Sequence, residues 1–218
     1  IPAKTKIVLV GDPCQLPPPF PCDMDEPNEW FSKNIFEKVS VVDYFDKRVS
    51  FLDTQYRMQR EIGELISQTF YDGQLKLGVS SSFELDEAMS RIFFINSSGV
   101  LKTRLSEVNL IDDQLRHNDT HAKIASKAIE IGLKKGFAPS DIGIIAPYNA
   151  QIAKIKGLID KMAVEGRITL MQADDIKVST IHSFQGQEKR MVIVDITDSN
   201  VQPTPLTAKG NLIKVALS

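Results

Sequence analysis

A tyrosine followed by an arginine, Tyr56-Arg57, is the pair in this sequence best suited to chemistry on a nucleotide. The guanidinium of arginine is charged at any working pH, and its planar fork of donors suits phosphate oxygens. A tyrosine ring offers a face on which a nucleobase can lie. Taken alone, the pair is explained more simply by a partly buried tyrosine beside an arginine in a surface ion pair. Its meaning therefore depends on the other motifs of the chain.

A second polar motif, residues 11–18, follows an apolar, β-branched run at residues 6–10. The run shows no alternation, which predicts a parallel strand covered on both faces. Ligands of open α/β sheets bind beyond the carboxyl ends of the strands, so this motif lies where a site is expected. The amide of Gln15, both donor and acceptor, could contact a terminal phosphate or an attacking water. The alternative is a polar turn that leads into a polyproline-like stretch.

Two further motifs follow predicted strands. The apolar run at 141–146 ends at Pro147-Tyr148, and the run at 176–181 ends in a polar stretch that closes with Glu188. Strands near residues 92, 142, 176 and 191, with helices between most of them, predict a parallel α/β sheet. Loops at the ends of its strands should share one rim. That rim is a physical reason to group Arg57, Tyr148 and Glu188 as site candidates.

Apolar spacing predicts the elements that position these motifs. Helices are expected from Asn28, as a cap, to about 36, and at 60–70, 121–135 and 151–164, with a short strand at 39–44. The pattern fades between 75 and 90. The acidic Asp86-Glu87 in that stretch follows no apolar strand, so we interpret it as a solvated turn and not as a magnesium-binding pair.

The composition sets further bounds. With 218 residues, of which 42% are apolar and 25% charged, the chain can bury a substantial core in one large or two small units. It has neither a run of roughly 20 apolar residues nor a secretory signal, and its two cysteines fit no metal or redox spacing. We therefore expect a cytoplasmic protein with free thiols and no membrane partner. A net charge of −2 restricts any nucleic-acid contact to a local groove.

Two histidines, His117 and His121, are four residues apart, a spacing that metal ligands on a helix can have. No third ligand is near, and signals for the start of a helix already explain the region. We expect no metal site there and interpret both histidines as solvated.

The four motifs, in this order, resemble successive motifs of the superfamily 1 helicases, which are P-loop ATPases. The likeness is greatest to the branch typified by the nonsense-mediated-decay helicases and their bacterial relatives. It is carried by GDPCQLPP at 11–18, QYRM at 55–58, IIAPYNAQ at 144–151 and VSTIHSFQGQE at 178–188.

The resemblance implies two RecA-like lobes, with ATP and Mg2+ between them and single-stranded DNA or RNA across both. Residues 1–50 would form the tail of the first lobe, and residues 51–218 the second lobe, ending within the last helicase motif. The remainder of the first lobe would then be a partner of this chain.

The resemblance also implies roles for particular residues. Gln15 would lie near the terminal phosphate and the attacking water, and Arg57 would reach the same phosphate from the opposite lobe, which makes both catalytic candidates. Tyr56 would border or stack on the base, and Glu188 would accept hydrogen bonds from the ribose, with Gly186 allowing close approach. Asp12 joins the nucleotide-binding candidates as part of the Gln15 motif.

Contacts to the nucleic-acid strand are implied for four residues at strand ends. Hydroxyls and backbone amides at these positions could hold phosphates, although each position is equally typical of ordinary strand-end chemistry. The four are Pro147, Tyr148, Ser179 and Thr180.

The sequence also departs from the family pattern. No G-x-x-x-x-G-K-[ST] phosphate loop occurs, no acidic pair precedes Ile7, His121 replaces a common glutamate and Lys214 a common asparagine. We therefore expect a fragment of a longer ATP-driven helicase, which by itself binds no cofactor and does not hydrolyse ATP. The alternatives are a nucleotide-gated regulatory ATPase that does not unwind duplexes, or a noncatalytic nucleic-acid-binding module.

Overall fold

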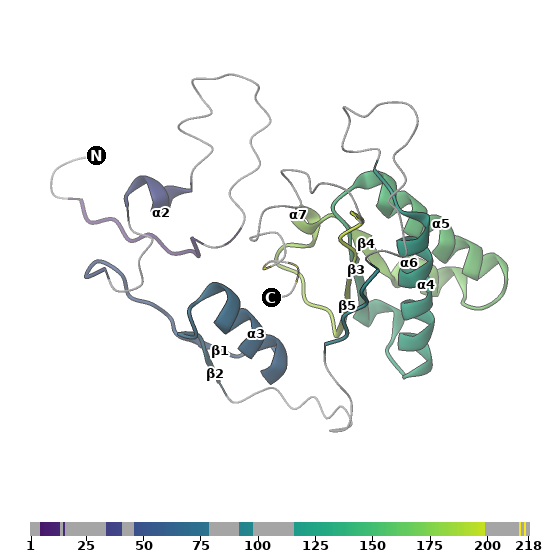
Figure 1. Ribbon diagram of the computed structural model, residues 1–218, viewed down its shortest axis with the longest axis horizontal. Helices are drawn as coiled ribbons and strands as arrows, with labels where there is room; N and C mark the ends of the chain where they lie inside the picture. The colour runs from purple at the N-terminus through teal and green to yellow at the C-terminus, as the bar shows by residue number, and fades with distance from the viewer. Residues whose placement is uncertain are drawn as a thin grey trace, which may run out of the picture. The chain divides into compact units, whose positions relative to one another are not determined.

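The computed structural model describes residues 5–13, 15, 34–40, 46–78, 92–97, 116–198, 214 and 216. The chain forms two compact units, a first unit at Ile1–Leu85 and a second unit at Asp86–Ser218 (Figure 1). The boundary between two lobes that the sequence predicts after residue 50 is a different division of the chain from these two compact units. It stays a prediction.

The second unit is built on three parallel strands. They are β3 (Ile142–Ile145), β4 (Lys177–Ser179) and β5 (Met191–Val194), in the order β4-β3-β5. All four residues of the central strand β3 are buried, as expected for an apolar strand with cover on both faces. The predicted α/β class, a parallel sheet flanked by helices as in the RecA-like P-loop fold, is confirmed.

Helices cover both faces of this sheet. They are α4 (Asp119–Lys134), the 3-10 turn η2 (Pro139–Asp141), α5 (Asn149–Val164), α6 (Leu170–Asp175) and α7 (Ile181–Phe184). Ile142 points toward α4, because its Cδ1 lies 3.5 Å from where Gly132 would carry a Cβ. Successive strand residues face opposite sides, so Gly143 faces the ring of Phe184 in α7. Figure 1 shows α4, α5 and α6 together on one side of the strands.

The core of the second unit lies between α4, α5 and the sheet. Ile129, Ile144, Ile155 and Met162 are fully enclosed there, and truncating such a side chain to alanine typically costs about 2–5 kcal/mol. Asn118 caps α4, since its side chain accepts from the backbone N–H groups of residues 120 and 121. The helices expected at 121–135 and 151–164 are thus confirmed.

The first unit contains a small β-α-β arrangement. Strand β1 (Thr54–Gln55) leads into α3 (Arg60–Phe70), which returns the chain to β2 (Lys76–Leu77), parallel to β1. The Oγ of Ser67 donates to the carbonyl oxygen of Leu75 at 2.8 Å and ties the helix to the second strand. The helix expected at 60–70 is confirmed.

A short helix, α2 (Ile35–Lys38), precedes this arrangement and is capped by Asn34. The sequence predicts Asn28 as the cap, but the described helix begins after Asn34, whose side chain accepts from the N–H of Glu37 at 2.9 Å. Residues 28–33 and 41–44, and with them most of the expected strand at 39–44, lie outside the described residues, as do Cys14, Cys22 and Asp86-Glu87.

Two predicted strands are absent from the described residues. Residues 6–10 and 92–95 belong to no strand, and Val8, Val10 and Phe94 are 84%, 88% and 84% exposed. β-branched and aromatic residues favour extended backbone, but a strand also needs a neighbour that completes its ladder. The sequence pattern indicates which residues favour a strand, but it does not show whether a neighbouring strand is present.

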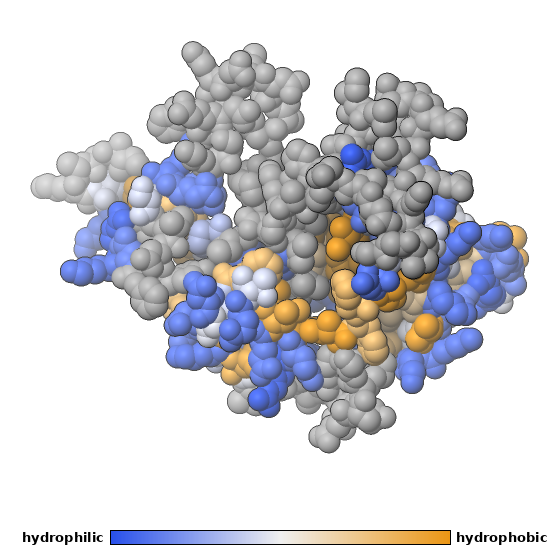
Figure 2. Space-filling model, in the orientation of Figure 1, coloured by the Kyte–Doolittle hydropathy of each residue, from blue (hydrophilic) through white to orange (hydrophobic). Residues whose placement is uncertain are grey.

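Part of the described surface of the second unit is apolar. Figure 2 shows apolar residues gathered where residues 92–97 and β5 lie, whereas hydrophilic residues cover the outward sides of α4 and α5. Exposed residues of this region include Phe93, Phe94, Val192 and Ile196. Among the helices that the structure describes, none has the length and apolarity to cross a membrane.

Candidate functional site

A tight turn presents Tyr56 and Arg57 at the carboxyl end of β1. The side chain of Gln55 closes this turn: its Oε1 accepts from the N–H groups of Arg57 at 2.8 Å and Met58 at 2.7 Å. Its Nε2 donates to the carbonyl oxygen of Met58 at 3.0 Å. Both Tyr56 and Arg57 are exposed. The strand therefore delivers a guanidinium and an aromatic ring to the surface on a well-fixed backbone.

The ring of Tyr56 lies over Gly78, the residue after β2. A Cβ at Gly78 would collide with the ring, so the glycine is what allows the ring to lie there. The Gly78 N–H also donates to the carbonyl oxygen of Gln55 at 2.8 Å. The ring is 67% exposed, so most of it stays accessible to a flat ligand such as a base.

The Asp12–Gln15 turn of the first unit is held from two sides. The hydroxyl of Tyr71, which follows α3, donates to Oδ2 of Asp12 at 2.6 Å, and Nδ2 of Asn34 donates to the carbonyl oxygen of Pro13 at 3.2 Å. The N–H of Gln15 donates to the carbonyl oxygen of Asp12 at 3.1 Å. Gln15 is exposed, whereas Asp12 is half-buried. Asp12 thus anchors the turn that presents Gln15.

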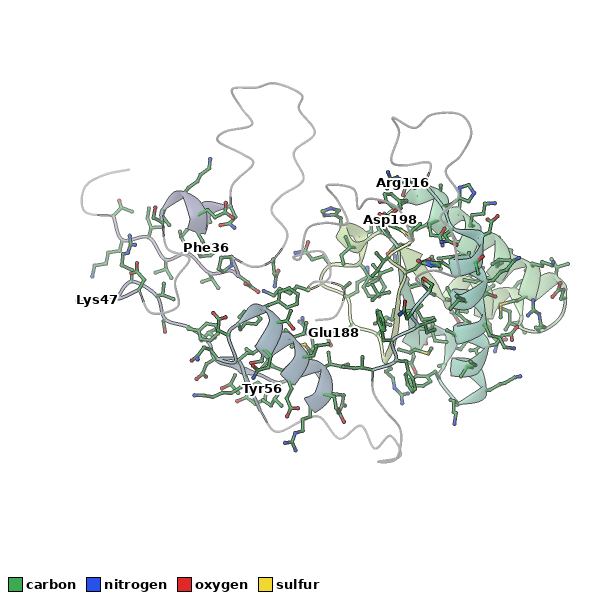
Figure 3. All side chains as sticks on the ribbon, in the orientation of Figure 1. Phe36, Lys47, Tyr56, Arg116, Glu188 and Asp198 are labelled. Atoms are coloured by element: carbon green, nitrogen blue, oxygen red, sulfur yellow. The ribbon has the colours of Figure 1, made fainter. Side chains whose placement is uncertain are left out.

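Tyr148, at the carboxyl end of β3, is enclosed and not displayed. It is 2% exposed, and its hydroxyl donates to Oδ2 of Asp198 at 2.9 Å, whose other oxygen accepts from Arg116 at 3.2 Å (Figure 3). In this structure the ring therefore supports the strand end from inside. Its expected contact with a nucleic-acid strand stays a prediction, and Pro147 beside it is half-buried.

Ser179 and Thr180 follow β4 at the same edge of the sheet. The N–H of Ala146 donates to the carbonyl oxygen of Ser179 at 3.3 Å, which brings the ends of β3 and β4 together. Oγ1 of Thr180 caps α7 by accepting from the N–H of Ser183, and Oγ of Ser179 donates to the carbonyl oxygen of Thr180 at 3.3 Å. Both side chains are half-exposed. The structure thus brings Pro147, Ser179 and Thr180 to one edge.

Gly186 and Glu188 lie in the loop between α7 and β5, and both are exposed. Gly186 has φ +80°, and a Cβ there would meet no atom within 4 Å. Glycine is therefore needed for the backbone conformation, and the space beside it is open to a ligand.

The position of Glu188 differs from the expectation of one shared rim. The next two residues are tied to the entrance of β3: Nζ of Lys189 donates to the carbonyl oxygen of Ser140 at 2.5 Å, and Arg190 to Asp141 at 3.0 Å. The connection between β4 and β5 contains only the short α7, which crosses the sheet face. By Glu188 (labelled in Figure 3) the chain is therefore next to the amino edge, opposite Tyr148.

A buried polar network near the carboxyl edge escaped the sequence analysis. The amide of Gln151, fully enclosed, donates to Oδ2 of Asp195 at 2.6 Å and accepts from the N–H of Asn118 at 2.7 Å. Nδ1 of His121 lies 3.0 Å from Oδ1 of Asp195, and its Nε2 lies 2.9 Å from Oγ of Ser97. The network joins α4, α5, the segment after β5 and the 92–97 segment.

The expectation that both histidines are solvated is wrong, because the side chain of His117 is only 17% exposed and that of His121 only 13%. His121 is hydrogen-bonded at both ring nitrogens. Nε2 of His117 lies 4.0 Å from Oδ1 of Asp119. Since Asp195 also accepts from Gln151 and from the Thr197 N–H, we assign the Ser97–His121–Asp195 line a structural role. Within the described ranges, no three potential metal ligands cluster together.

Comparison with known proteins gives consistent matches. The AAA domain family model matches residues 31–217. The chain is 32% identical over 202 residues to regulator of nonsense transcripts 1 of Dictyostelium discoideum, a match that covers 89% of this chain and 14% of that protein. It is 28% identical over 219 residues to DNA polymerase alpha-associated DNA helicase A of Saccharomyces cerevisiae, covering 89% and 30%.

A third relative is the putative helicase mov-10-B.2 of Danio rerio, 30% identical over 233 residues, with 96% of this chain and 22% of that protein covered. The chain thus spans less than a third of the length of each of these three relatives.

Proposed function

The chain belongs to the superfamily 1 helicases, and from that membership we propose that it supplies the arginine-bearing half of an ATP site. The protein in which it would act is an ATP-dependent helicase or translocase on single-stranded DNA or RNA. Both relatives with "helicase" in their names contain the region matched here. The finer assignments below rest on the geometry of each unit taken by itself.

The observation that carries the proposal is the exposed Tyr56-Arg57 pair on its braced turn. Phosphoryl transfer requires the reacting groups to be positioned and the developing charge to be stabilised, with little covalent help from the protein. A guanidinium on a fixed backbone meets both requirements. Arg57 would pair with the γ-phosphate oxygens, and the accessible ring of Tyr56 would lie against the base.

Other residues of the chain would complete the nucleotide contacts. The exposed amide of Gln15, on a turn anchored through Asp12, would orient the attacking water or sense the terminal phosphate. Glu188 would accept hydrogen bonds from the ribose hydroxyls, with open space beside Gly186 for the sugar to approach. When bound, Mg2+ would supply positive charge against the phosphates.

The residues present fit only part of an ATP site. They include a guanidinium for the γ-phosphate, but the sequence contains no glycine-rich loop with lysine to cradle the phosphates. We therefore propose that the 218-residue chain does not hydrolyse ATP by itself and acts together with the remainder of a first RecA-like lobe. Magnesium-dependent ATPase of the purified chain, lost on Arg57→Ala, would contradict this.

For the strand contact we propose the carboxyl edge of the second unit, where the hydroxyls of Ser179 and Thr180 lie near Pro147. Tyr148 would act there by supporting the edge from inside, through its bond to Asp198. Hydroxyls and backbone amides hold phosphates without reading sequence.

The experiment that tests the function measures ATP hydrolysis and strand displacement by the longer protein that carries this chain, with and without single-stranded DNA or RNA. We expect ATPase that the single strand stimulates, together with displacement of a paired strand. Stimulated ATPase without displacement would instead identify a nucleotide-gated regulatory ATPase. Binding without any ATPase would identify a noncatalytic nucleic-acid-binding module.

A further inference from the structure

We propose that Gln55 is a positioning residue for Arg57, holding the arginine at the place where it meets the nucleotide. The inference rests on the proposed function of Arg57. Gln55 itself need not touch the nucleotide, because the three hydrogen bonds of its side chain all lie within the turn. The sequence shows Gln55 as the first residue of the QYRM motif, and the structure shows what its side chain contacts.

The first argument is the number of hydrogen bonds that one side chain makes. Oε1 of Gln55 accepts from two successive backbone N–H groups, those of Arg57 and Met58, and Nε2 donates to the carbonyl oxygen of Met58. Residues on an exposed turn would otherwise bond to water and move. The amide takes the place of water at the N–H groups of Arg57 and Met58 and at the carbonyl oxygen of Met58.

The second argument is that Gln55 is itself held in place. It pairs with Leu77 in the β1–β2 sheet, and its carbonyl oxygen accepts from the Gly78 N–H at 2.8 Å. Its amide passes close to α3, where a Cβ on Gly63 would lie 2.9 Å from Nε2 and would also meet Leu77. A glycine at 63 thus leaves the space that the glutamine amide occupies.

These contacts matter for a charge that must meet a transferring phosphate. Arginine has a long side chain, so a shift of its backbone moves the guanidinium by a comparable distance. A misplacement of about 1 Å can cost roughly 100-fold in rate. An arginine that acts chiefly in the transition state affects kcat more than KM. We therefore expect a Gln55 variant to lose kcat while KM for ATP changes little.

The test uses two near-isosteric variants in the longer protein that carries this chain. Gln55→Met removes all three bonds, whereas Gln55→Glu retains the oxygen that accepts from Arg57 and Met58. We expect kcat for ATP hydrolysis to fall about 10- to 100-fold in Gln55→Met, with KM within about 3-fold. Gln55→Glu should recover part of the loss, since its second oxygen would face the carbonyl oxygen of Met58 in place of the donating Nε2. Equal losses in the two variants would overturn the inference.

A double variant separates positioning from general structural support. If Gln55 acts through Arg57, adding Gln55→Met to Arg57→Ala should lower kcat by less than about 2-fold more, because the two changes remove one effect. A full additional loss would overturn the inference. If Arg57→Ala alone leaves kcat unchanged, the proposed function fails. If it lowers kcat and Gln55→Met does not, only the role of Gln55 fails.

A second measurement needs no catalysis and uses the 218-residue chain. Amide hydrogen exchange at Arg57 and Met58 should be slowed by the glutamine oxygen despite the exposure of the turn, and Gln55→Met should accelerate it about 10-fold or more at both positions. Gln55→Glu should preserve the protection. Equal exchange in the wild type and Gln55→Met would overturn the inference, whether or not the longer variant is active.

Discussion

Replacing Gln151 with methionine is expected to destabilise the second unit strongly, because methionine has a similar length but cannot form hydrogen bonds of the amide type. The glutamine side chain is fully enclosed and contacts Asp195 and both backbone groups of Asn118. The carbonyl oxygen of Asn118 keeps a partner, the N–H of Ala122 at 3.0 Å. Two groups therefore lose this partner: the Asn118 N–H and Oδ2 of Asp195.

Each buried group left unsatisfied costs about 1–3 kcal/mol, and a charged oxygen lies toward the upper end. The expected loss is thus about 4 kcal/mol. For a chain of this size, that corresponds to a decrease in Tm of roughly 8–16 °C. Urea unfolding followed by far-ultraviolet circular dichroism measures the free energy, and a thermal scan measures Tm.

The matched control is Gln187→Met, at an exposed glutamine whose side chain donates to the carbonyl oxygen of Ser183. It should change the free energy of unfolding by no more than about 0.5 kcal/mol. A loss below about 1 kcal/mol for Gln151→Met would show that the buried network does not stabilise the unit, and the description of the α4–α5–Asp195 junction would be refuted.

Two further predictions concern surface features of the second unit. A hydrogen bond from Lys127 is the main cause that lowers the pKa of Glu130 below its ordinary value of 4.5; burial opposes it, and the charges of Lys127 and then Arg167 add to it. The ionised carboxylate therefore contributes its full stabilisation of the folded state above pH 4.5. The Tm of the wild type should exceed that of Glu130→Gln there, and the difference should shrink as the pH falls below 4.5. A difference in Tm that stays constant down to about pH 2 would contradict this. Gly186→Ala should lower the free energy of unfolding by about 1 kcal/mol through the positive φ alone, and Gly186→Asn should lower it less. Thermal unfolding of the two variants measures both losses. Equal losses would exclude the backbone conformation as the cause.

The regular elements of the second unit were predictable from local pattern. A 3.6-residue apolar period marks α4 and α5, and a short apolar run bounded by turns marks β3, so each was found close to its true ends. Patterns of this kind report which side of an element is apolar. They do not report which neighbour covers it, and for that reason the strands predicted at 6–10 and 92–95 could fail: both segments lie outside any described sheet.

The candidate site was predictable where the residue types alone indicate a function. Tyr56 and Arg57 are as exposed as a ligand-binding pair should be. Tyr148 was expected to contact a nucleic-acid strand, but its ring is enclosed. The sequence of a tyrosine after a strand is the same whether the ring turns inward or outward. Here its hydroxyl bonds to Asp198, which is 50 residues away in the sequence.

The hydrogen bonds of Gln55, Gln151 and His121 were not predicted, for a related reason, although the two glutamines lie within quoted motifs and His121 was considered as a metal ligand. Their roles depend on hydrogen bonds that no spacing rule encodes, and two of the three bond to residues far along the chain. A signal did exist for Gln151. It directly precedes Ile152 in the apolar stripe of α5, and a polar residue beside such a stripe must find a buried partner.

The most direct test of the central claim compares Arg57→Ala with Arg60→Ala in the longer protein that carries this chain. Arg60 is also exposed and begins α3, where it pairs with Glu64 at 2.9 Å. If Arg57 neutralises charge on the transferring phosphate, single-strand-stimulated ATP hydrolysis should fall by about 1,000-fold or more in Arg57→Ala. Arg60→Ala should stay within about 3-fold of the wild type. Equal activity of the two variants would contradict the assignment of this turn to the ATP site.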